Sequence, residues 1–141
     1  MAELSKAKLA NLEEDLRSYK QLPRKMAEAL IADEWQPNDV KAWMKNPMDQ
    51  QEKVMNEKTQ KGKNKSYMYY ATLYEDITKV YNQLSEELKE LVDVYLWGEY
   101  SYLSWPEIAK ATYFSTAGIY KKRYRILEKL AIERGILVRV E

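Results

Sequence analysis

The sequence predicts an all-α protein, and three observations support this fold class. The 141 residues include only four Gly and four Pro, whereas the helix-forming residues Leu, Lys, Glu and Ala are frequent. Apolar residues recur at intervals of three and four, which is the period of an amphipathic helix. Serine precedes several of these apolar runs, in the position that caps a helix. We expect a helical N-terminal half, a long linker and a C-terminal pair of helices joined by a tight turn.

Residues 1–44 form the predicted N-terminal helical region. Leucines at helical spacings, with charged residues between them, indicate an amphipathic helix over residues 3–20: Leu4, Leu9, Leu12 and Leu16. Pro23 stands where a second helix can begin, because the missing N–H of proline is tolerated in the first turn. This second helix should continue to about Glu34. The leucine stripe would either join two copies of the chain in a homodimer or pack within its own chain.

Residues 45–65 are polar and rich in Lys and Gln, and they include Gly62. A stretch of this length without an apolar pattern is unusual inside a compact domain. We therefore predict a flexible polar linker, followed by a helical domain that spans residues 66–141.

The first part of this domain predicts two helices. A broad apolar and aromatic face runs from Ser66 to Leu84, and its tyrosines share that face with aliphatic residues. Packing in a core or against a partner helix is therefore favoured over stacking on nucleic-acid bases. Ser85 caps the next helix, which runs to Trp97, and the acidic residues after Ser85 oppose the positive end of the helix dipole. Gly98 ends that helix.

Residues 104–134 predict a helix-turn-helix. Ser104 and Glu107 form a capping box at the start of the first helix. Ala109 is small, as the close crossing of two helices requires, and Phe114 should fill the space between them. Ser115 caps the second helix, whose buried side should consist of Ile119, Ile126, Leu127 and Leu130.

The charge distribution indicates what this motif binds. The net charge is only +1, but residues 75–99 carry seven acidic and two basic groups, whereas residues 105–141 carry eight basic and four acidic groups. A helix-turn-helix can place its second helix in the major groove of double-stranded DNA, and a segregated positive charge suits that role. We expect contacts to DNA phosphates and base edges from Lys110, Ser115, Thr116, Ala117, Tyr120, Lys121, Arg123, Tyr124 and Arg125.

The helix-turn-helix and the helix before it share a pattern with region 4 of the sigma-70 family. The matching residues are Leu84, Leu88, Leu91, Tyr95, Leu103, Ser104, Trp105, Pro106, Glu107, Ile108, Ala109, Phe114, Ser115, Ile119, Arg125, Leu127 and Leu130. The whole chain also resembles the small phage-encoded late-gene activators of the RinA and ArpU type. In the N-terminal half, the likeness lies in residues 16–19 and in the helix that ends at Trp35. The resemblance implies activation of phage or prophage packaging and structural genes in the cytoplasm of a bacterial host.

Lys122 departs from this family pattern, since its position is usually apolar. Its aliphatic stem would lie along the core while its ammonium group reaches water.

Enzymatic function is not expected. The chain has no His and no Cys, and it has no Gly-rich loop that could cradle phosphates. Acidic neighbours such as Glu13 and Glu14 are interpreted as surface charge or helix caps rather than a two-carboxylate site. We predict no cofactor and no metal. No apolar run approaches the roughly 20 residues that span a bilayer, so no membrane association is expected.

The sequence thus predicts a DNA-binding transcriptional regulator whose acidic surface from Glu86 to Asp93 faces away from DNA and contacts RNA polymerase. Two alternatives stay open. One is a phage small terminase subunit that recognises packaging-site DNA. The other is a protein-interaction module that does not bind DNA and uses the aromatic face from Tyr67 to Leu84.

Overall fold

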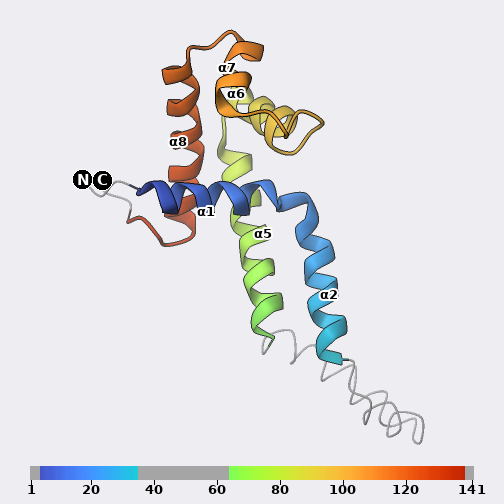
Figure 1. Cartoon of the computed structure of the whole chain (residues 1–141). Coiled ribbons are helices and arrows are strands. Elements are labelled where there is room, and N and C mark those ends of the chain that lie inside the picture. The colour runs from blue at the N-terminus through green and yellow to red at the C-terminus, as the bar shows by residue number, and fades with distance from the viewer. Residues whose placement is uncertain (1–3, 35–63, 139–141) are drawn as a thin grey trace, which may run out of the picture. The chain divides into compact units, whose positions relative to one another are not determined.

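The computed structural model describes residues 4–34 and 64–138, and within these ranges it contains helices and no strand (Figure 1). The all-α prediction is confirmed for this part of the chain. The elements are α1 (Lys6–Arg17), the 3₁₀ turn η1 (Tyr19–Gln21), α2 (Leu22–Glu34), α5 (Lys65–Gln83), α6 (Glu86–Leu91), the π-helical segment η2 (Val92–Leu96), α7 (Trp105–Thr112) and α8 (Thr116–Glu133).

The predicted linker falls almost entirely outside the described residues. Only its last two residues are described, and α5 already begins at Lys65, one residue before the expected start at Ser66. Asn64 takes the role of the capping residue, because its Oδ1 accepts a hydrogen bond of 2.9 Å from the amide of Tyr67.

The chain divides into two compact units, and the division differs from the one expected between residues 1–44 and 66–141. Among the described residues, one unit comprises 4–20 and 75–138, and the other comprises 21–34 and 64–74. Helix α1 therefore belongs with the helix-turn-helix. The reason is that α1 packs on α8, an arrangement that a sequence pattern cannot reveal.

The smaller unit pairs α2 with the first half of α5. Asn64 Nδ2 donates a hydrogen bond of 3.0 Å to the carbonyl of Ala29, and the ammonium group of Lys25 lies 5.7 Å from the centroid of the Tyr70 ring. The later residue of α2 contacts the earlier residue near the start of α5, so the two segments run antiparallel.

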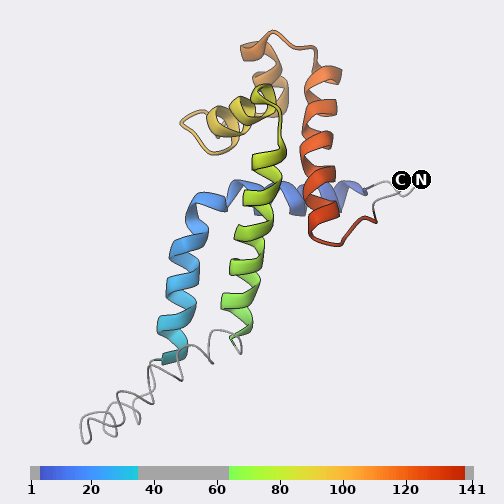
Figure 2. The same cartoon turned by 180° about the vertical axis from the view of Figure 1, so that it is seen from behind.

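The larger unit is built around α8, across which α1 lies in both views (Figure 1, Figure 2). Leu4, Leu12 and Leu16 of the predicted leucine stripe are buried in the single chain, as the alternative of packing within its own chain predicts. Apolar residues from each of the other helices complete the core: Ile77, Val80, Leu84, Leu88, Leu91, Val92, Leu96, Ile108, Ala109, Ile119, Ile126, Leu127 and Leu130.

Helix α6 continues into a π-helical segment before the chain turns toward α7. The predicted helix from Ser85 to Trp97 is thus two segments, and the amide of Trp97 donates to the carbonyl of Val92, five residues earlier. A Cβ atom at Gly98 would lie 2.7 Å from the carbonyl oxygen of Asp93. A glycine is therefore required where the chain leaves this segment.

None of the helices in residues 4–34 and 64–138 is long and apolar enough to cross a membrane.

Candidate nucleic-acid interface

The capping box that begins α7 forms as predicted. Ser104 Oγ accepts a hydrogen bond from the amide of Glu107, and Glu107 Oε1 accepts from the Ser104 hydroxyl at 2.8 Å and from its amide at 3.3 Å. These hydrogen bonds from Ser104 lower the pKa of Glu107. The direction and start of α7 are thus set by local sequence.

The crossing of α7 and α8 also follows the prediction. Ala109 retains only 2% exposure, and Ile108 and Ile119 are fully buried beside it. Ser115 caps α8, because its Oγ accepts a hydrogen bond of 3.0 Å from the amide of Gly118. Two capped helices around a small residue give the hairpin a defined geometry, which a recognition helix needs.

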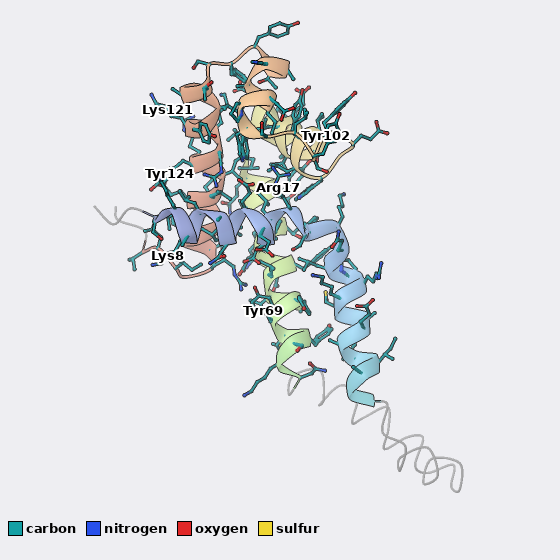
Figure 3. The ribbon with its side chains drawn as sticks, viewed as in Figure 1. Lys8, Arg17, Tyr69, Tyr102, Lys121 and Tyr124 are labelled. Atoms are coloured by element: carbon teal, nitrogen blue, oxygen red, sulfur yellow. The ribbon has the colours of Figure 1, made fainter. Side chains whose placement is uncertain are left out.

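Most of the predicted contact residues are exposed on this hairpin. Figure 3 shows Lys121 and Tyr124 on the side of α8 that faces away from α6. Tyr124 is half-buried, and the other members are exposed: Lys110, Ser115, Thr116, Ala117, Tyr120, Lys121 and Arg125. A helix repeats every 3.6 residues, so positions 117, 120, 121 and 124 form one continuous strip.

Lys121 of this strip and the neighbouring Arg125 have no carboxylate partner among residues 4–34 and 64–138. No acidic oxygen in these ranges lies within ion-pair distance of either cation. An unpaired, exposed cation can bind a phosphate group without first giving up an internal partner.

Arg123 does not share this face, in contrast to its predicted role as a DNA contact. Its Nε lies 2.6 Å from Glu13 Oε1, its guanidinium lies 5.8 Å from the centroid of the Trp105 ring, and its side chain is 18% exposed. The reason is helical rotation, because position 123 lies four residues after Ile119 and four before Leu127, on the buried side. The three-and-four spacing of the apolar residues could therefore have shown that position 123 faces the core.

Glu13 joins three helices, and its interpretation as surface charge is corrected here. Its Oε1 accepts hydrogen bonds from Arg123 Nε and from Trp105 Nε1 at 2.7 Å, and its Oε2 accepts from Arg17 Nε at 3.1 Å. Burial acts to raise the pKa of Glu13, but these hydrogen bonds and the charges of Arg123 and Arg17 outweigh it and lower the pKa. Glu13 of α1 is thereby bonded to both α7 and α8.

Lys122 forms an ion pair with a partly exposed carboxylate, a partner that the prediction of an ammonium group in water did not include. Its Nζ lies 3.2 Å from Glu87 Oε1 and 4.6 Å from the centroid of the Phe114 ring. The basic cluster at 121–125 is therefore divided, since Lys121 and Arg125 point outward and Lys122 and Arg123 hold the unit together.

A pocket of about 380 Å³ lies beside the Lys122–Glu87 ion pair, between α6, η2, α7 and α8. Its lining combines apolar side chains with the two acidic residues Glu87 and Glu90. Sequence reasoning did not predict the pocket, because its walls come from separate segments. Glu86 of the same helix is almost fully exposed and its Oε1 lies 3.8 Å from Lys89 Nζ, so α6 presents three acidic residues and one lysine near the pocket.

Comparison of the chain with protein-family models, with curated protein sequences and with solved structures finds no match.

Proposed function

We propose that this protein binds double-stranded DNA through the exposed strip of α8 and regulates transcription. One observation carries the proposal: Thr116, Ala117, Tyr120 and Lys121 are exposed along one side of a helix whose opposite side is buried. The N-terminal turns of such a helix can enter the major groove, where side chains reach base edges. Arg125 and Lys110 would bind phosphates and fix the register.

The internal pairing of neighbouring cations supports the proposal, because it leaves a defined subset of charges available. Lys122 and Arg123 are bound to Glu87 and Glu13, whereas Lys121 and Arg125 remain exposed. A rigid helix with outward cations on one side differs from a general basic surface. This arrangement predicts that charge reversal at Lys121 weakens DNA binding more than charge reversal at a distant lysine does.

Binding to a duplex is tested by a gel-shift titration at several salt concentrations. The affinity of the wild-type protein should fall steeply as salt rises, because phosphate contacts release counterions. Lys121→Glu should reduce the affinity at least about tenfold. Lys79→Glu is the matched control, since Lys79 is exposed on α5 and undergoes the same change of charge. Equal losses in the two variants would contradict the proposal.

The resemblance to phage late-gene activators extends the proposal to activation of packaging and structural genes, with RNA polymerase as the partner. The acidic surface of α6 supports such a second contact, because it is separated from the basic strip. Glu86 and Glu90 are suitable test positions, whereas Glu87 holds Lys122. Reversal of both charges should reduce activation in a reconstituted transcription assay and leave DNA binding unchanged. A parallel loss of DNA binding would contradict this role.

A further inference from the structure

The turn between α7 and α8 has an unusual residue at its centre. Tyr113 has a φ of 62°. Among the residues that the structure describes, no other residue except glycine has a positive φ. The amide of Phe114 donates to the carbonyl of Ala109 at 3.0 Å, and the amide of Tyr113 donates to that of Lys110. This pair of hydrogen bonds is the Schellman motif, whose left-handed position usually holds glycine because a Cβ atom is disfavoured there.

The same chain uses glycine for the same motif at the end of α8. Gly135 has a φ of 75°, the amide of Ile136 donates to the carbonyl of Ala131 at 2.9 Å, and the amide of Gly135 donates to that of Ile132 at 3.1 Å. The two turns therefore have the same hydrogen-bond pattern and differ in the side chain at the left-handed position. Backbone geometry alone does not account for a tyrosine at 113.

The tyrosine ring does not offset this cost inside the protein. The side chain of Tyr113 is 97% exposed, whereas the next residue, Phe114, is partly buried beside Lys122. An exposed aromatic ring with a hydroxyl group is suited to an external partner, because it offers an apolar body and a hydrogen-bond donor. Among residues 4–34 and 64–138 no contact explains the tyrosine, which points to a partner outside the chain.

We propose that Tyr113 contacts the sugar-phosphate backbone of double-stranded DNA, with its hydroxyl donating a hydrogen bond to a phosphate oxygen. The inference rests on the proposed function. Tyr113 stands two residues before Ser115, the cap of α8, and the exposed strip begins two residues after that cap, at Ala117. If the first turn of α8 enters the groove, the preceding turn lies at the groove edge, along which the phosphates run. Tyrosine hydroxyls are among the groups that bind DNA phosphates.

The deciding experiment combines thermal unfolding with binding to a random-sequence duplex, because a backbone contact does not depend on base sequence. Tyr113→Gly should raise the melting temperature by about 3 °C, because the left-handed strain is removed. The same variant should bind the duplex roughly fivefold more weakly, with an unchanged salt dependence, since tyrosine carries no charge. A residue with a purely structural role would not move stability and binding in opposite directions.

Tyr113→Phe separates the hydroxyl from the ring. This variant keeps the strained backbone and the aromatic ring, so its melting temperature should match that of the wild-type protein while most of the affinity loss remains. If Tyr113→Gly and Tyr113→Phe bind like the wild-type protein, or if Tyr113→Gly lowers the melting temperature, the inference is overturned. In that case the proposed function still stands if Lys121→Glu weakens binding to the duplex. The proposed function itself is contradicted if the wild-type protein shows no salt-dependent binding.

Discussion

The guanidinium group of Arg123 lies 2.6 Å from the carboxylate of Glu13, although the two residues are 110 positions apart in the chain. Both side chains are only 18% exposed. Trp105 donates to the same carboxylate oxygen, so α1, α7 and α8 meet at one acidic side chain. The contact turns Arg123 away from the exposed strip and attaches the N-terminal helix to the helix-turn-helix.

Removal of the charge of Glu13 should destabilise the larger unit. Glu13→Gln leaves the guanidinium of Arg123 without a carboxylate in a poorly solvated position, and we expect a loss of about 2 kcal/mol in the free energy of unfolding. Denaturant unfolding followed by circular dichroism measures this loss. Glu14→Gln is the matched control, because Glu14 is exposed and its substitution should change stability by less than about 0.5 kcal/mol. Similar losses in both variants would contradict the role of Glu13.

The contribution of Glu13 should depend on pH. Its pKa in the folded protein is below the ordinary value of 4.5, so the unfolded chain binds a proton more readily at this site. The stabilisation is therefore fully present above pH 4.5 and is lost as the pH falls through the lowered pKa. The difference in unfolding free energy between the wild-type protein and Glu13→Gln should be constant near neutral pH and should decrease in acid. A difference that grows in acid would have the wrong sign.

Two neighbouring lysines should respond differently to the same substitution. Lys121 is exposed, whereas the ammonium group of Lys122 is bound to Glu87. Lys121→Met should reduce the slope of log affinity against log salt by about 1, because one phosphate or base contact is lost. Lys122→Met should leave that slope unchanged and alter stability by less than about 1 kcal/mol, since Glu87 is more than half exposed. Equal reductions of the slope in the two variants would contradict the distinction between the exposed Lys121 and the paired Lys122.

The crossing of α7 and α8 should not accept a larger side chain at its centre. Ala109 is 2% exposed, and a leucine there would separate the two helices or force strained rotamers. We expect Ala109→Leu to destabilise the protein by about 2 kcal/mol and to weaken DNA binding, because the strip on α8 loses its fixed position. Ala10→Leu on α1 is the control, since Ala10 is exposed. Thermal unfolding and the gel shift report the two effects, and an unchanged melting temperature for Ala109→Leu would argue against close packing at this point.

The helices and their caps could be predicted because they depend on neighbours in the sequence. The capping box of Ser104 and Glu107, the caps at Ser85 and Ser115, and the small residue Ala109 are all present as expected. The spacing of the apolar residues also placed position 123 on the buried side of α8, between Ile119 and Leu127. The predicted DNA contact of Arg123 followed instead from its place in a cluster of basic residues.

The partners of Glu13 and Lys122 were decided by the tertiary structure alone. A hydrogen bond between residues 13 and 123 depends on how α1 lies across α8, and no local pattern encodes that arrangement. The pairing of Lys122 with Glu87 likewise depends on the packing of α6 against α8. The sequence by itself determined which segments are helical, where several of them begin and which sides are apolar, because these properties follow from hydrogen bonds and spacing within a few residues. The choice of which cations in residues 121–125 are paired and which are exposed required the packed chain, because it depends on carboxylates supplied by distant helices.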